Sequence, residues 1–227
     1  MKKTHHSDYD EFIRKTVPHY DTILSEVAAL ISSFHINPFS LLDIGCGTGT
    51  FVSLLADQFP DCRYTLCDKS DEMLSSARKK LEQNQNCTFL KTDIRSFQDQ
   101  EAFHFISALL VNHYLDHADI EQAFSDCFQA LKPGGVFLTL QNTAPSTEAG
   151  ETIALDRWSQ FQMSMGKSET ETVMHKARYG NDYFPRTLDQ QKALLERAGF
   201  ETIELFWFSC MQAGLYAIKP KSASLED

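Results

Sequence analysis

The stretch SLLDIGCGTGTFVSLL, residues 40–55, decides the fold. It begins with the apolar run LLDI, which is typical of a buried strand. Gly45, Gly47 and Gly49 follow this run, and the apolar residues after them have helical spacing. A strand, a glycine-rich turn and a helix in this order predict the first unit of a nucleotide-binding α/β fold.

Strand-like segments recur along the rest of the chain. They lie at residues 64–67, 87–91, 103–110, 136–140, 201–208 and 212–218. Helical segments separate the earlier ones, and this alternation predicts parallel strands with helices on both faces. The last two are joined by a tight link and predict an antiparallel hairpin. The expected fold is an α/β, doubly wound, Rossmann-like sheet of seven mostly parallel strands, with a C-terminal hairpin and a helical cap.

The chain reads as one core with additions, not as two independent domains. Residues 1–11 are polar and expected to be loose, Pro18 is expected to divide the first helical segment in two, and residues 132–135 (KPGG) predict a turn. The predicted organisation is N-terminal cap helices at 1–36, a cofactor-binding core at 37–140, a substrate-cap insertion at 141–186, completion of the core at 187–220 and a tail at 221–227.

Composition limits the classes of function. The net charge of −10 opposes binding to nucleic-acid phosphates, and the 42% apolar content is that of an ordinary globular protein. Six cysteines show no metal-ligand spacing, and neither a secretory leader nor an apolar run of membrane-spanning length is visible. The expectations are a cytoplasmic protein with free thiols, no metal site, no membrane contact and a small-molecule partner.

Three carboxylates end three predicted strands. They are Asp43, Asp68 and Asp93. Parallel strands present their carboxyl ends at one edge of the sheet, so these acids are expected to converge there. Asp68 is placed to accept ribose hydroxyls, and Asp93 to reach an adenine amino group. A loop for phosphate would favour lysine or an open helix N-terminus. Acids therefore favour a cofactor without phosphate and disfavour a dinucleotide oxidoreductase.

Four motifs together resemble the class I S-adenosylmethionine-dependent methyltransferases. They are DIGCGTG (43–49), LCDKSDEML (66–74), KTDI (91–94) and LKPGG (131–135). The resemblance implies S-adenosyl-L-methionine as cofactor and S-adenosyl-L-homocysteine as product. It places the glycine loop against the methionine and ribose, Asp43 at the ammonium group and Asp68 at the ribose. The implied binding residues are Asp43, Gly45, Cys46, Gly47, Thr48, Gly49, Asp68, Lys69, Met73, Asp93, Ile94, Ala108 and Leu109.

A narrower resemblance reaches both ends of the chain. The segments IRKTVPHYDTI (13–23) and QKALLERAGFETIELFWF (191–208) are similar to the carboxy-S-adenosylmethionine synthases of tRNA wobble-uridine modification. This similarity implies that Tyr20 folds over the cofactor and suggests a homodimer. In those synthases an arginine grips the extra carboxylate, and Leu194 occupies the aligned position here. Leu109 also replaces an expected polar residue. Because apolar side chains cannot pair a carboxylate, both departures favour ordinary S-adenosylmethionine.

The predicted function is therefore S-adenosylmethionine-dependent methyl transfer to a small molecule. The sequence lacks the Asn/Asp-Pro-Pro-aromatic and Pro-Cys motifs of nucleic-acid methyltransferases. A carboxy-S-adenosylmethionine synthase and a non-catalytic cofactor-binding regulator remain alternatives. His113 is the candidate general base, with a packing role as its alternative. The acceptor pocket is expected beneath the N-terminal helices and residues 141–186, where aromatic candidates are Tyr114, Trp158, His175, Tyr179 and Tyr183.

Overall fold

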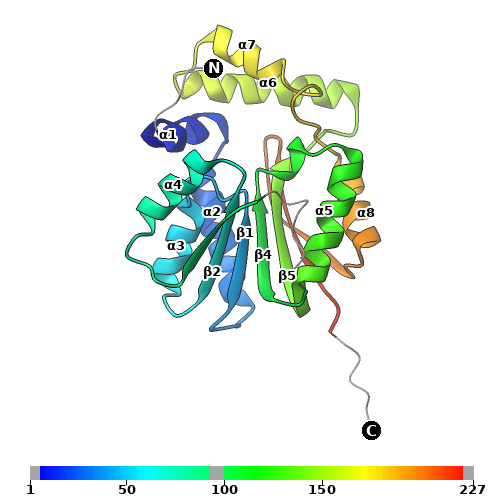
Figure 1. Ribbon diagram of the computed structural model, residues 1–227. Helices are drawn as coiled ribbons and strands as arrows, with labels where there is room; N and C mark the ends of the chain where they lie inside the picture. The colour runs from blue at the N-terminus through cyan, green and yellow to red at the C-terminus, as the bar shows by residue number, and fades with distance from the viewer. Residues whose placement is uncertain (1–5, 93–99, 222–227) are drawn as a thin grey trace.

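The computed structural model describes residues 6–92 and 100–221 and shows one sheet between two helical layers (Figure 1). The sheet order is β3-β2-β1-β4-β5-β7-β6. The first five strands run parallel, and β7 pairs antiparallel with both β5 and β6. The predicted fold class is confirmed. The strands are β1 (Ser40–Ile44), β2 (Arg63–Asp68), β3 (Cys87–Lys91), β4 (Phe103–Leu109), β5 (Leu131–Asn142), β6 (Thr202–Ser209) and β7 (Gln212–Ile218).

Two apolar clusters attach the helices to the sheet. One joins α2, α3 and α4 to one face, and the other joins α5 and α8 to the opposite face. Side-chain caps fix several helix starts: Ser70 accepts a hydrogen bond at α4, and Asp116 does so at α5. The helices are α1 (His6–Thr16), α2 (Tyr20–Ser33), α3 (Thr50–Gln58), α4 (Asp71–Lys80), η2 (Asn112–Tyr114), α5 (His117–Ala130), α6 (Glu148–Ser164), α7 (Glu169–Lys176) and α8 (Leu188–Ala198).

The turn predicted at residues 132–135 is instead part of β5. The strand runs from Leu131 to Asn142, and its ladder with β4 is irregular between Phe103 and Phe105. Gly134 has a positive φ of 76°, a conformation that glycine adopts without strain. The glycine pair therefore produces an irregularity inside a strand, because β4 pairs with β5 at Leu131 before the pair and again from Val136 after it.

Helix α1 lies between the sheet and the layer formed by α6 and α7 (Figure 1). As predicted from Pro18, the first helical segment is divided, and His19 takes a left-handed φ of 60° between α1 and α2. Trp158 Nε1 donates a 2.6 Å hydrogen bond to Thr16 O, and Lys167 Nζ donates one of 2.6 Å to Thr16 Oγ1. The insertion thus holds the carboxyl end of α1. The expectation that residues 1–11 are loose is wrong from His6 onward.

The C-terminal hairpin depends on a glycine. A Cβ on Gly214 of β7 would lie 2.4 Å from Cζ of Phe206 on β6. We expect Gly214→Ala to lower the free energy of unfolding by about 1–3 kcal/mol, because the extra methyl group overpacks this contact. Thermal unfolding measures the loss. Phe206→Leu in the same chain removes the ring and should restore part of the stability; an unchanged melting temperature in Gly214→Ala would contradict the packing.

Three further observations concern membrane spans, metal sites and cysteines. In the described ranges, no helix combines the length and the apolar character needed to cross a membrane. Within those same residues, no group of His, Cys, Asp or Glu side chains is arranged to hold a metal ion. All six cysteines are free thiols.

Candidate cofactor-binding site

A cavity of about 410 Å³ lies at the carboxyl ends of β1, β2 and β4. Its floor is the glycine loop, residues 45–48, together with the strand ends that carry Asp43 and Asp68. Residues of α1 and α2 line the opposite side. A pocket at this edge of an open parallel sheet is where such folds bind ligands, because the loops diverge there.

The glycine loop requires glycine for space as well as for conformation. Gly45, Gly47 and Gly49 have positive φ angles of 66°, 54° and 75°. A Cβ on Gly45 would lie 2.3 Å from Val111 Cγ2, in the link between β4 and η2. At Gly47 the nearest atom, Tyr9 Cε1, would be 3.8 Å away. The loop therefore touches the neighbouring strand end at Gly45 but remains open toward the cavity at Gly47.

This difference predicts unequal effects for two alanine substitutions. We expect Gly45→Ala to destabilise the protein by about 2–4 kcal/mol, since overpacking adds to left-handed backbone strain. Gly47→Ala is the matched control, and it should lose only the strain component of about 1–2 kcal/mol. Chemical denaturation of both variants measures the two losses. Equal losses would contradict the contact with Val111.

Asp68 joins the loop to the next helix. Its Oδ2 accepts a 3.0 Å hydrogen bond from Gly47 N, and its Oδ1 accepts one of 2.8 Å from Ser70 N. The carboxylate also lines the cavity. Its position at the end of β2 is the one predicted, and each oxygen has a second lone pair with which to accept a ligand hydroxyl.

Asp43 is a buried carboxyl on the cavity wall, with only 3% of its surface exposed. Burial raises the pKa of Asp43 to about 7, with a smaller contribution from the nearby charge of Asp68. Ser107 Oγ donates a 2.7 Å hydrogen bond to Asp43 Oδ1 and opposes this rise. A cationic group in the cavity would favour the ionised carboxylate, so the site is built to receive positive charge.

Most of the predicted cofactor-binding residues meet at this cavity. Besides the residues above, its wall includes Tyr20, Cys46, Thr48, Lys69, Met73 and Leu109. Two predicted residues lie elsewhere: Gly49 faces Ala77 of α4, and Ala108 is fully buried in the core. Asp93 and Ile94 fall outside the described residues.

Helix α1 contributes side chains that were not predicted from the sequence. Tyr9 and Ile13 line the cavity from above, one helical turn apart. Burial raises the pKa of Tyr9 to about 12, so its phenol remains neutral. The spacing of Tyr9 and Ile13 was the available signal, but it is weak inside a segment of eleven mostly polar residues.

The comparisons with known proteins agree with this geometry. Residues 41–135 match the family model of a methyltransferase domain. The chain therefore resembles methyltransferases in this region. The chain is 25% identical to the carboxy-S-adenosyl-L-methionine synthase of Pseudoalteromonas atlantica over 221 aligned residues. The aligned region covers 93% of this chain and 88% of that protein. The predicted enzyme class, an S-adenosylmethionine-dependent methyltransferase, is thus supported at the level of the family.

Solved methyltransferase structures share the fold of this domain. The apo S-adenosylmethionine-dependent methyltransferase SibL superimposes with a TM-score of 0.64 and 14% identity, covering 89% of this chain and 57% of that one. Human N-acetylserotonin methyltransferase, solved with S-adenosylmethionine, gives a TM-score of 0.60 and 14% identity over 90% of this chain and 52% of that one. At such identities the likeness concerns the fold alone.

His113 does not lie on the cavity wall. It is 3% exposed and packs against the rings of Tyr114 and Tyr183, while its Nδ1 accepts a 3.4 Å hydrogen bond from Asn142 N. Burial, with the nearby charge of Arg178, lowers the pKa of His113 to about 3. The structure therefore supports the packing role and not the predicted general base. Tyr114 lines the cavity instead.

Two other expectations about the site are corrected. No described residue of 141–186 lines the cavity; Trp158 and Tyr183 form a separate cluster that braces α1. Leu194 is 3% exposed in the core between α8 and the sheet. Because Leu194 does not line the cavity, its apolar side chain is no direct evidence about which form of the cofactor binds.

Proposed function

We propose that the cavity binds S-adenosylmethionine and that this chain transfers the methyl group to a small-molecule acceptor. The observation that carries the proposal is the pair of carboxyls, Asp43 and Asp68, on the wall of a cavity formed by a glycine loop. The cofactor bears an ammonium and a sulfonium group and no phosphate, so acids suit it better than a basic loop. Support comes from the family match at residues 41–135.

Each side chain receives a role from its place on the wall. Asp43 binds the ammonium group, Asp68 accepts the ribose hydroxyls, and Lys69 and Met73 flank the adenine. Leu109 faces the methionine end, where Tyr20 covers it. Asp93 and Ile94 remain predicted contacts at the adenine edge.

The chain's own contribution to catalysis is alignment and exclusion of water. When bound, the cofactor supplies a methyl group activated by its attachment to the sulfonium, and the sulfur leaves as the neutral thioether of S-adenosylhomocysteine. The apolar side chains Ile13, Leu24 and Leu140 on the wall keep water from the methyl group. Tyr9 and Tyr20 restrict the direction from which an acceptor approaches. This role needs no buried base, in agreement with the position of His113.

The charge of the cavity narrows the class of acceptor. Among the described residues that line it, the acids are Asp43, Asp68 and Asp119, and the only cation is Lys69. Anionic acceptors such as phosphorylated sugars would be repelled, since like charges in a partly enclosed site interact strongly. We therefore infer a neutral or cationic acceptor that carries an aromatic or apolar group.

Turnover tests this proposal. The protein is incubated with S-adenosylmethionine and paired acceptors that differ in one carboxylate or phosphate, and S-adenosylhomocysteine is measured by mass spectrometry. The neutral or cationic member of a pair should give product and the anionic member much less. Turnover confined to anionic acceptors would contradict the charge argument. Tight cofactor binding without turnover on any acceptor would favour the non-catalytic regulator.

A second candidate is a carboxy-S-adenosylmethionine synthase. Its support is the 25% identity to such a synthase over 93% of this chain. The extra carboxylate of that product would need a cationic partner, which the described cavity wall offers only in Lys69. Mass spectrometry of the ligand released from purified protein separates the two. An unmodified cofactor or its demethylated product supports methyl transfer, and a carboxylated cofactor supports the synthase.

A further inference from the structure

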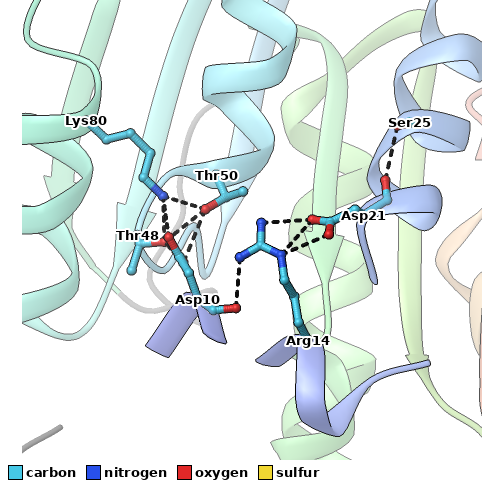
Figure 2. Close-up of polar contacts among 7 residues, drawn as sticks. All are labelled: Asp10, Arg14, Asp21, Ser25, Thr48, Thr50 and Lys80. Atoms are coloured by element: carbon cyan, nitrogen blue, oxygen red, sulfur yellow. Dashed lines mark hydrogen bonds and ion pairs between the residues drawn. The ribbon is translucent and has the colours of Figure 1, made fainter. Parts of the chain in front are cut away.

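Helix α1 is tied to the glycine loop through one carboxylate, Asp10 (Figure 2). Asp10 Oδ1 accepts hydrogen bonds from Thr48 Oγ1 at 2.6 Å and from Thr50 Oγ1 at 3.3 Å. Asp10 Oδ2 accepts one from Lys80 Nζ of α4 at 2.8 Å. The Asp10 side chain therefore joins three separate elements, which are the helix α1, the loop before α3 and the helix α4.

The position of Asp10 suits a charge that stabilises the loop. The two threonines flank Gly49, the N-cap residue of α3, which provides no side-chain cap of its own. A carboxylate near the first turn of a helix is favoured by the helix dipole. Only 25% of the Asp10 side chain and 29% of Lys80 are exposed, so this ion pair is less screened than a surface pair.

The remainder of α1 is attached differently. At its carboxyl end, Thr16 is held by Trp158 and Lys167 of the insertion. Beyond it, His19 takes a left-handed conformation that separates α1 from α2. Helix α1 thus has an anchored end next to a bend, and Asp10, near its other end, connects it to the loop.

The cavity-facing side chains of α1 lie beside this connection. Tyr9 is the neighbour of Asp10 in sequence, and Ile13 lies one turn further along. Loss of the Asp10 contact would therefore release the roof of the cavity from the loop. Lys80 Nζ would still hold the two threonines that flank Gly49, through hydrogen bonds of 3.1 Å to Thr48 Oγ1 and 2.6 Å to Thr50 Oγ1.

We propose that Asp10 is a positioning residue that fastens α1 to the glycine loop, and that α1 is the lid through which the cofactor enters and leaves. The inference rests on the proposed function, because it takes the cavity to be the cofactor site. Asp10 touches no reacting atom; it acts through Thr48 and Thr50 on the loop and through Tyr9 on the roof.

Asp10→Asn tests the lid without any ligand. Hydrogen exchange of the α1 backbone is compared in the wild type and the variant, with α2 as internal reference. Losing charge-assisted hydrogen bonds should speed exchange in α1 about 10-fold or more and leave α2 unchanged. Glu11→Gln is the matched control, because it removes the same charge from an exposed i,i+4 pair with Lys15 on the same helix. Equal exchange in Asp10→Asn and wild type would overturn the proposal.

A second readout uses the cofactor. Trp207→Phe leaves Trp158, which contacts α1, as the only tryptophan, so its fluorescence reports lid movement in stopped-flow experiments. In this background Asp10→Asn should release S-adenosylhomocysteine about 10-fold faster and raise the KM for the cofactor similarly, with less effect on kcat. Unchanged release would overturn the lid role.

Two outcomes separate this inference from the proposed function. Failure of the wild type to bind S-adenosylhomocysteine would refute the cofactor site, while faster exchange of α1 in Asp10→Asn would still support the Asp10 contact. If Asp10→Asn does not fold, Lys80→Met removes the cationic partner of the same carboxylate and should speed α1 exchange in the same direction. No change in Lys80→Met would overturn the proposal.

Discussion

Asp43→Asn is expected to stabilise the ligand-free protein and at the same time to weaken its binding of S-adenosylmethionine. Asp43 is buried, and its pKa is raised to about 7 from an unfolded value near 3.9. This difference corresponds to a destabilisation on the order of 4 kcal/mol above pH 7. An asparagine keeps an oxygen that accepts from Ser107 but carries no charge, and recovering even half of that energy raises Tm by about 4–8 °C.

The sign of the pH dependence follows from proton binding. Between pH 4 and 7 the folded protein keeps the Asp43 proton and the unfolded chain has lost it, so this group's contribution to stability falls as pH rises. The Tm difference between Asp43→Asn and wild type should therefore be small near pH 4 and largest at pH 8. Scanning calorimetry across this range measures it, and a difference independent of pH would contradict the buried carboxyl.

Cofactor affinity should depend on pH in the opposite direction to the stability contribution of Asp43. The ammonium group of the cofactor favours ionised Asp43, so wild-type affinity should increase as pH rises through 7, with release of a proton. Asp43→Asn should bind at least tenfold more weakly at pH 8 and lose this pH dependence. Calorimetric titration in two buffers of different ionisation enthalpy detects the proton.

Asp68→Ala is expected to reduce cofactor affinity by at least about 100-fold. The variant loses two charge-assisted hydrogen bonds to the ribose, each worth roughly 1.5–3 kcal/mol. It also frees Gly47 N and Ser70 N, which Asp68 holds in the ligand-free protein, so stability should fall as well. Titration with S-adenosylhomocysteine measures the affinity, and thermal unfolding without ligand measures the loss of stability separately.

Asp71→Ala is the matched control for Asp68→Ala. Asp71 lies in the first turn of α4, its side chain is 75% exposed, and it pairs with Lys91 on the surface. Its removal should change affinity less than twofold, since exposed pairs contribute roughly 0–1 kcal/mol. Comparable losses in the two variants would show that general negative charge, and not a contact of Asp68, attracts the cofactor.

Much of the fold could be predicted because its signals are local. The run from Leu41 to Ile44, the glycine loop and the end of β2 at Asp68 each follow from short-range pattern. Pro18 correctly marks the division of the N-terminal helices. The glycine pair at 134–135 was wrongly interpreted as a turn, because glycine occurs both in turns and in irregular strands. Only the pairing with β4 on both sides of the pair decides between them.

The residues that line the cavity could be predicted only where they lie at the ends of strands, because the strand order fixes their positions. Asp43 and Asp68 were found because the order of strands brings their carboxyl ends together. His113 and Leu194 were misjudged because burial depends on helices distant in sequence, η2 against β5 in one case and α8 against the sheet in the other. The roof was predicted to combine the N-terminal helices with residues 141–186. Residues of α1 and α2 line the cavity and residues 141–186 do not, a division that no local pattern encodes.

The most direct test of the account is calorimetric titration of ligand-free protein with S-adenosylhomocysteine and, separately, with NAD. We predict saturable binding of S-adenosylhomocysteine at one site per chain, abolished or greatly weakened in Asp68→Ala and retained in Asp71→Ala, with no measurable binding of NAD. Absence of S-adenosylhomocysteine binding, or tighter binding of NAD, would contradict the assignment of the cavity to a sulfonium cofactor.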